Sequence, residues 1–152
     1  MGRMRDAQAP WLADSQVMER RVLHSFRPHP RAAAKARAAL DASLDLFSEV
    51  LDEQRLDDLR LLTSELVSNS VRHGGRSQEK PIRVQVSVTD VAVRVAVVDS
   101  GTGFDVTPKP IRADDDGGWG LFLLDRLADR WGMDEKGTTT VWFELDRASS
   151  SP

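Results

Sequence analysis

The apolar and polar positions of the chain follow two different periods. Between residues 30 and 51 apolar side chains recur every three or four positions, and a second such stretch begins near residue 56. Residues 82–89 instead alternate between apolar and polar side chains, and residues 91–98 are almost continuously apolar. Steps of three or four residues indicate a helix with one buried face, whereas steps of two indicate a strand. The pattern therefore predicts two helices followed by a β-hairpin.

The two predicted helices have recognisable ends. The first begins at Pro30, which suits a first helical turn because the N–H that proline lacks would have no partner there. The second begins near Leu56 or Asp57, and Gly74 and Gly75 supply its stop. The apolar stripe of the first helix consists of Ala33, Ala36, Leu40, Leu44, Phe47 and Leu51. The inner stripe of the second consists of Leu59, Leu62, Leu66 and Ser70.

Further elements flank this central part of the chain. The short run Val22–Phe26, which precedes two prolines, predicts an edge strand. The hairpin should turn around Thr89 and Asp90, and its second strand should be the more buried one because it is the more continuously apolar. Residues 99–118 predict a long loop, and residues 138–145 a last strand. Between them lies a predicted third helix that ends at Gly132 and has Leu121, Leu124, Leu127, Ala128 and Trp131 on one face.

The predicted order is strand, helix, helix, hairpin, loop, helix, strand. Helices clustered against one sheet give an α+β fold, here a two-layer α/β sandwich with a mixed, mainly antiparallel sheet. Residues 1–19 lack a clear period and are expected to form a flexible N-terminal tail. Residues 20–146 would form the folded domain, and residues 147–152 a disordered C-terminal tail.

Composition narrows the classes of function. The 152 residues suffice for one domain with its own core, and a net charge of −3 gives no bulk attraction to nucleic acid or to an anionic membrane. The chain has no cysteine, which excludes disulfides, thiol catalysis and thiolate metal sites. No apolar run approaches the roughly 20 residues of a membrane span, and no signal peptide is evident. We therefore expect a cytoplasmic single-domain protein.

A first group of candidate functional residues lies on the second predicted helix. Glu65, Asn69 and His73 are spaced four residues apart, so they share a helix face, and Arg72 lies beside them. They border the apolar stripe, where a carboxylate and an amide are costly unless they are paired. The alternative interpretation is a solvated helix edge with a satisfied histidine.

Two glycine-rich segments form the second and third groups. Residues 99–103, Asp-Ser-Gly-Thr-Gly, directly follow the more buried strand. The Asp99 carboxylate can accept a hydrogen bond from an exocyclic amino group, and the glycines let the backbone pass close under a flat ligand. Residues 117–121, Gly-Gly-Trp-Gly-Leu, open the third helix, where free backbone amides suit phosphates. Each segment is also compatible with an ordinary tight turn.

The three groups in this order resemble the ATP-binding domain of the GHKL superfamily, over roughly residues 20–146. Residues 65–74 look like its N box, residues 99–103 like its G1 box and residues 118–121 like its G2 box. Neither a Gly-x4-Gly-Lys-Ser/Thr phosphate loop nor a complete dinucleotide fingerprint is present. The short chain, the N-box form and the ending at residues 140–145 look like the stand-alone bacterial anti-sigma-factor serine/threonine kinases.

The resemblance implies roles for the residues of the second helix. Asn69 would coordinate the Mg²⁺ that bridges the phosphates of ATP, because amide oxygens are among the hard ligands that Mg²⁺ prefers. Glu65 matches the general base that takes the proton of the attacking hydroxyl. Arg72 and His73 would complete the nucleotide-binding set on this helix.

The resemblance also implies an adenine site and a phosphate site. Asp99 would accept a hydrogen bond from the adenine amino group, Gly101 and Gly103 would pass beneath the ring, and Thr139 would complete recognition from the last strand. The threonines on either side of Thr139 are the alternatives at that register.

At the phosphates, Gly118, Gly120 and Leu121 would supply backbone amides. Residues 104–117 would form a lid over them.

Two functions from different classes remain open. The first is an ATP-dependent kinase that sequesters a sigma factor and phosphorylates Ser or Thr of an antagonist protein. The second is a non-catalytic ATP-binding switch that binds a regulatory partner without phosphotransfer. Glu65 favours the first function, because a purely structural ATP site needs no base. The resemblance implies no direct contact with nucleic acid or membrane, and it leaves formation of a homodimer open.

Overall fold

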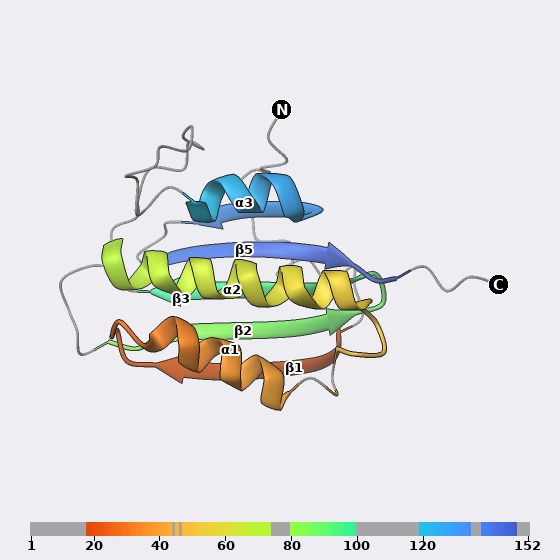
Figure 1. The fold of residues 1–152 in the computed structure, drawn as a ribbon, viewed down its shortest axis with the longest axis horizontal. Helices are drawn as coiled ribbons and strands as arrows, with labels where there is room; N and C mark the ends of the chain where they lie inside the picture. Colours follow the sequence, from red (N-terminus) through yellow and green to blue (C-terminus); the bar gives the residue numbers. More distant parts are fainter. Residues whose placement is uncertain are drawn as a thin grey trace.

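The computed structural model describes residues 18–43, 45, 47–73, 80–99, 119–134 and 138–148. Figure 1 shows the elements in these ranges. The strands are β1 (Met18–Phe26), β2 (Ile82–Thr89), β3 (Ala92–Asp99), β4 (Arg130–Asp134) and β5 (Thr139–Asp146). The helices are α1 (Ala32–Ala42), α2 (Glu53–His73) and α3 (Trp119–Leu127). None of these helices is long and apolar enough to cross a membrane.

The strands form one sheet in the order β1-β2-β3-β5-β4. The sheet was expected to be mixed and mainly antiparallel, and each of its four pairings is antiparallel. Short connections join β2 to β3 and β4 to β5, and strands joined in this way run antiparallel. The predicted edge strand is confirmed as β1. It begins at Met18 and so includes the last two residues of the segment expected to be a tail.

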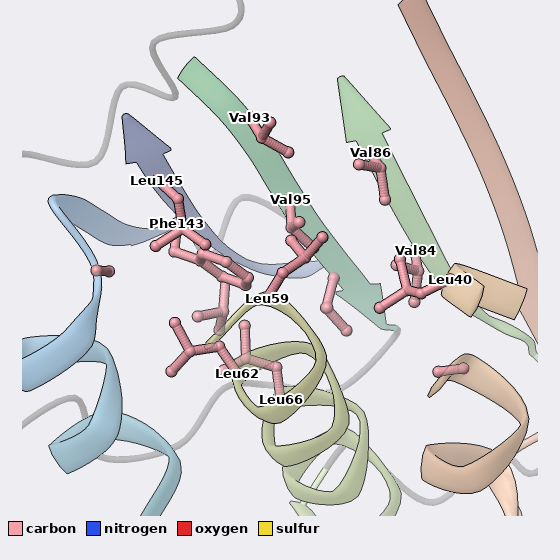
Figure 2. Packing of buried hydrophobic residues seen from close by; sticks show 14 of the residues in the cluster. Leu40, Leu59, Leu62, Leu66, Val84, Val86, Val93, Val95, Phe143 and Leu145 are labelled. Atoms are coloured by element: carbon pink, nitrogen blue, oxygen red, sulfur yellow. The ribbon is translucent and has the colours of Figure 1, made fainter. Parts of the chain in front are cut away.

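The three described helices cover one face of the sheet, so the predicted two-layer α+β arrangement is confirmed (Figure 1). Figure 2 shows Leu59, Leu62 and Leu66 of α2 pointing at Val95 of β3 and Phe143 of β5. All five side chains are at most 2% exposed. As predicted, β3 is the more buried strand of the hairpin, since seven of its eight residues are buried. The core therefore lies between α2 and the middle of the sheet.

Helix α2 begins earlier than its apolar stripe predicted. Asp52 precedes the helix and its Oδ1 accepts a hydrogen bond of 2.8 Å from the backbone N–H of Arg55. This is the contact of an N-cap residue, which satisfies one of the donors left open at a helix start. The helix therefore begins at Glu53. It ends at His73, and the predicted glycine stop lies outside the described residues.

Helix α1 is shorter than predicted. Its apolar stripe runs to Leu51, but the helix ends at Ala42 because the backbone N–H of Ser43 bonds to the carbonyls of both Ala39 and Leu40. A donor shared between two carbonyls in this way is typical of a helix end. Phe47 and Leu51 are still buried, although they lie in turns and not in the helix. Helical spacing of apolar residues thus predicted their burial correctly and their secondary structure wrongly.

The prediction of a third helix that extends to Gly132 is also wrong. Helix α3 ends at Leu127, and strand β4 follows. Trp131 belongs to the core with Met133, two positions further along, which is the period of a strand. Gly132 lies between them against the indole of Trp142, since a Cβ on this glycine would approach that ring to 2.8 Å. The glycine therefore permits close packing within the sheet.

The sheet face turned away from the helices carries a chain of ion pairs. Glu144 of β5 pairs with Arg94 at 3.0 Å and with Arg130 at 3.1 Å, one from each neighbouring strand. Arg130 also contacts Asp146. Burial lowers the pKa of Arg130, but its hydrogen bonds and charge interactions with Asp146 and Glu144 raise the pKa above its usual value on balance. The Arg94 and Glu144 side chains are only 3% and 2% exposed, so neither charge is shared with bulk water.

We predict that Glu144→Ala lowers the free energy of unfolding by about 3–5 kcal/mol, because it removes a buried carboxylate that pairs with the buried guanidinium of Arg94. The control is Asp146→Ala, which removes a carboxylate that is 49% exposed from the same chain of ion pairs. This control should cost less than about 1 kcal/mol. Urea unfolding followed by circular dichroism measures both. Equal losses of unfolding free energy in the two variants would show that the buried Arg94–Glu144 pair stabilises the fold no more than the exposed Arg130–Asp146 pair.

Candidate functional site

Four segments with candidate functional residues meet at one end of the molecule. In Figure 1 the end of α2, the end of β3 and the start of β5 lie together at the left of the view, where α3 also begins. The antiparallel pairing of β3 with β5 sets the last residue of β3 beside the first residue of β5. The candidate residues at this end of the molecule are Asn69 of α2, Asp99 of β3, Leu121 of α3 and Thr139 of β5.

Asp99 and Thr139 are direct partners across β3 and β5. They are 5% and 1% exposed, so both polar side chains are buried, and each makes polar or electrostatic interactions within the protein. Thr140 pairs instead with Val98, and Thr138 is exposed. Of the three threonines that the sequence offered, Thr139 is therefore the one beside the carboxylate. A carboxylate and a hydroxyl held together in a buried position can recognise a donor and acceptor pair on a ligand.

Asn69 lies in the C-terminal part of α2 and is 2% exposed. Its Oδ1 accepts a hydrogen bond of 3.1 Å from a guanidinium nitrogen of Arg72, one turn later and itself exposed. This bond offsets the desolvation of the buried amide. Glu65 lies one turn before Asn69 and is half-buried, which sets a carboxylate beside the amide along the helix. His73 is the last residue of α2, and its side chain lies outside the described part.

Leu121 lies in the first turn of α3 and is 7% exposed. The backbone of Gly120 is helical, so both residues belong to the turn whose N–H groups have no carbonyl partner within a helix. The start of α3 therefore has the backbone geometry that favours an anion. Gly101, Gly103, Gly118 and the predicted lid at residues 104–117 lie outside the described residues.

Sequence reasoning missed an ionic contact that holds α3 against α2. Arg55, in the first turn of α2, donates to the carbonyl of Leu127 at 2.9 Å and to Oδ2 of Asp129 at 2.6 Å. The same carboxylate oxygen accepts the backbone N–H of Asp146 at 2.8 Å. One arginine thus connects α2, the end of α3 and the last strand. No sequence period joins residues 74 positions apart, so no local signal indicated the contact.

A groove beside the site was also missed. It has a volume of about 240 Å³ and is lined by Pro30 and Ala33 before and within α1 and by Ser68, Val71 and Arg72 of α2. It is smaller than the roughly 300–1,000 Å³ of pockets that enclose whole small-molecule ligands. Arg72 connects the groove to the candidate site, because its side chain lines the groove and donates a hydrogen bond to Asn69.

The donor set at this end of the molecule suits a magnesium–nucleotide complex. The part of the chain with described positions contains no group of three or more His, Cys, Asp or Glu that could hold a metal ion by itself. Mg²⁺ commonly takes one or two protein oxygens and completes its shell with phosphates and water. The buried Asn69 amide, one turn from the Glu65 carboxylate, provides oxygen ligands of the required hardness. Asn69 and Glu65 are therefore compatible with the Mg²⁺–ATP complex that the family resemblance implied.

A family model identifies the class of protein to which this fold belongs. The family model of the histidine kinase-like ATPase domain matches residues 26–144, which is most of the chain. The chain belongs to this family. Its ordered motifs and the arrangement of its described helices on one face of an antiparallel sheet agree with that membership.

Individual relatives narrow the comparison. The serine-protein kinase RsbW of Listeria innocua is 32% identical over 88 residues, which are 50% of this chain and 56% of that protein. An anti-sigma F factor of Clostridium botulinum is 32% identical over 94 residues, with 61% of this chain and 64% of that protein covered. The anti-sigma F factor of Clostridium beijerinckii is 28% identical and covers 70% of this chain and 80% of that protein. The chain thus spans little more than half the length of the RsbW it matches.

A solved structure shares the fold. The crystal structure of the RsbU and RsbW domains of a Mycobacterium tuberculosis protein superposes with a TM-score of 0.67 at 22% identity. The similarity covers 87% of this chain and 34% of that one.

We predict that Arg55→Ala lowers the free energy of unfolding by about 1–3 kcal/mol, because the carbonyl of Leu127 and the half-buried Asp129 lose a charged donor. Arg60→Ala is the matched control. Arg60 is on the same helix and similarly exposed, but both of its carboxylate partners are exposed by more than half. Its loss should stay below about 1 kcal/mol. Thermal or urea unfolding gives both values, and an Arg55→Ala loss no larger than the control would argue against the contact.

Proposed function

We propose that this chain binds ATP with Mg²⁺, transfers the γ-phosphate to a Ser or Thr of an antagonist protein, and sequesters a sigma factor. The observation that carries the proposal is the buried pair of Asp99 and Thr139, which lies at the same end of the molecule as Asn69. The names of the relatives, a serine-protein kinase and anti-sigma F factors, support the choice of reaction and partners.

In this proposal, Asp99 and Thr139 recognise adenine. The Asp99 carboxylate accepts a hydrogen bond from the exocyclic amino group, and the Thr139 hydroxyl bonds to the ring edge. Both side chains are buried, so water competes little for these bonds and the carboxylate interacts more strongly than it would on a surface. A charge-assisted bond of this kind distinguishes adenine from bases that present an acceptor at the same position.

The phosphates lie between α2 and the start of α3 in this proposal. Mg²⁺ supplies charge neutralisation at the phosphate oxygens when it is bound, and Asn69 contributes one of its oxygen ligands. Oδ1 of Asn69 accepts a bond from Arg72, so in this proposal the same guanidinium lies within reach of the phosphates. Arg72 is exposed and lies near the end of its helix, so it can turn toward a phosphate oxygen without disturbing the core.

Glu65 is the general base of the proposed reaction. Residues four apart on a helix have Cβ atoms about 5–6 Å apart, so Glu65 can reach a hydroxyl that approaches phosphates held beside Asn69. A half-buried carboxylate is accessible to a hydroxyl of a partner protein. A site that only binds nucleotide has no need of a base at this position.

The partners follow from the class of the relatives. In the proposed reaction the hydroxyl substrate belongs to another chain, and the proposal assigns that role to a protein of the anti-sigma-factor antagonist class. A cytoplasmic location and formation of a homodimer belong to the same proposal.

Incubation with γ-labelled ATP and Mg²⁺, alone and with candidate antagonist proteins, tests the reaction. Label on a Ser or Thr of a candidate supports the kinase. Nucleotide binding without transfer to any candidate favours the non-catalytic switch instead.

We predict that Asp99→Asn weakens ATP binding ten- to a hundred-fold. A hydrogen bond to a charged group contributes about 1.5–3 kcal/mol, and each 1.4 kcal/mol changes a dissociation constant tenfold. Asp90→Asn, in the exposed hairpin turn, is the control and should bind like the unchanged protein. Calorimetric titration with ATP measures both dissociation constants. An unchanged affinity in a folded Asp99→Asn protein would remove the proposed adenine contact.

We predict that Glu65→Gln keeps the affinity for ATP and slows phosphotransfer by about 10²–10⁴, the usual contribution of a general base. The amide retains the size of the side chain but cannot take up the proton. Glu53→Gln, at the exposed start of the same helix, is the control and should react at the normal rate. Single-turnover transfer from labelled ATP gives the rates. Full activity of Glu65→Gln would show that another group acts as base.

A further inference from the structure

The orientation of the Asn69 amide depends on one contact. The side chain is 2% exposed, and its Oδ1 accepts a hydrogen bond of 3.1 Å from a guanidinium nitrogen of Arg72. Within the described part of the chain, neither of these two side chains makes another hydrogen bond or ion pair. A buried amide at the candidate site is thus held by a single exposed cation.

An asparagine amide has two ends of nearly the same size and of opposite chemistry. Oδ1 accepts hydrogen bonds and can ligate a hard metal ion, whereas Nδ2 only donates and cannot. Steric fit separates the two ends poorly, because the last torsion of the side chain is broad and roughly two-fold. The hydrogen-bond partner of Asn69 therefore decides which end of the amide faces a ligand.

Arg72 can bond to only one of these ends. A guanidinium carries N–H donors and no acceptor, so it bonds to Oδ1 and has nothing to offer Nδ2. The ammonium group of a lysine is likewise a donor without an acceptor. A glutamine side chain has both kinds of group and could bond to either end of the amide. The chemistry of Arg72 thus fixes the side of Asn69 on which the oxygen lies.

The fold places Arg72 where this contact can form. Arg72 follows Asn69 by three residues, and residues three apart are neighbours on a helix surface. It lies in the last turn of α2, where the helix dipole favours a positive charge. Its side chain also lines the groove with Pro30 and Ala33, so the start of α1 offers an apolar wall to the aliphatic stem.

We propose that Arg72 is a positioning residue that holds the Asn69 amide with Oδ1 directed to Mg²⁺. A carbonyl oxygen has two lone pairs, so Oδ1 can keep this bond while it ligates a metal. The other donors of the guanidinium stay available for a phosphate oxygen. Partners that orient a metal ligand in this way change metal affinity by about 10–100-fold. The role rests on the proposed binding of Mg²⁺ and ATP, and it adds a residue that acts through Asn69.

The dissociation constant of ATP, measured by calorimetric titration with Mg²⁺ and with EDTA, tests this role. A contact between Arg72 and a phosphate contributes in both conditions, whereas the orientation of Asn69 matters only when Mg²⁺ is present. We expect Arg72→Gln to weaken ATP binding about ten-fold more with Mg²⁺ than with EDTA. Arg72→Lys should restore most of the Mg²⁺-dependent affinity, because lysine is also a donor without an acceptor.

Arg37→Gln is the matched control, because it removes an exposed cation from the neighbouring helix α1. It should leave both dissociation constants unchanged. Equal weakening by Arg72→Gln with Mg²⁺ and with EDTA would overturn the proposal, since Arg72 would then act on the phosphates alone.

A second measurement needs no nucleotide. Asn69 is the only asparagine of the chain, so protein labelled with ¹⁵N-asparagine gives the signal of one side-chain amide in NMR spectra. We expect one sharp pair of Nδ2 proton resonances in the unchanged protein and in Arg72→Lys, and a doubled or broadened pair in Arg72→Gln. Circular dichroism checks that each variant is folded. One sharp pair in folded Arg72→Gln, or a doubled pair in the unchanged protein, would contradict the positioning role.

The two measurements separate this role from the proposed function. If the unchanged protein binds no ATP, the proposed function is wrong, and the amide resonances still decide whether Arg72 orients Asn69. If ATP binds but Arg72→Gln alters neither the Mg²⁺-dependent affinity nor the amide resonances, the proposed function stands and the positioning role is wrong.

Discussion

The packing of α2 on the middle of the sheet is the interaction on which the rest of the structure depends. Leu59, Leu62 and Leu66 lie on β3 and β5, and this contact fixes how the helix is turned about its axis (Figure 2). Once that turn is fixed, the helical period sets the directions of Glu65 and Asn69. Asn69 is then directed toward the interior and Glu65 toward its edge, at the end of the sheet where β3 stops. The candidate site is therefore a consequence of core packing.

The antiparallel ladder of β3 and β5 supplies the second constraint. Its register makes Asp99 and Thr139 neighbours, although they are far apart in sequence and separated by a helix and a strand. A slip by one residue would turn Thr139 away from the core and bring Thr138 or Thr140 into its place, because side chains alternate between faces. The valines and aromatic residues on the core side prevent that slip. Burial of apolar side chains in the middle of the sheet thus determines that Asp99 and Thr139 lie side by side at its end.

The sequence predicted those features that a local period controls. The stripe of α2, the hairpin and the last strand were predicted closely. The candidate residues at the ends of α2 and β3 lie at one end of the sheet, and their roles stay predictions. Strand β4 was missed because Trp131 fits a helical step from Leu127 as well as a strand step to Met133, and only pairing with β5 decides between them. The end of α1 depends on a shared backbone bond, and the role of Arg55 depends on a residue 74 positions away. Long-range contacts of this kind have no periodic signal.

The central strand β3 carries buried residues on both of its faces. The run at residues 91–98 is apolar at nearly every position, and this pattern is typical of a strand that is buried on both faces. A two-layer sandwich buries one face only, so the run already contained more apolar residues than that architecture requires. The structure accounts for the excess, because Val93, Val95 and Val97 face α2 while Ala92 and Ala96 are buried on the other side. Arg94 interrupts the run without breaking the rule, since Glu144 neutralises it within the same buried face. The small side chains at Ala96 and Gly132, which flank Trp142 on the neighbouring strands, leave room for its indole within this buried face.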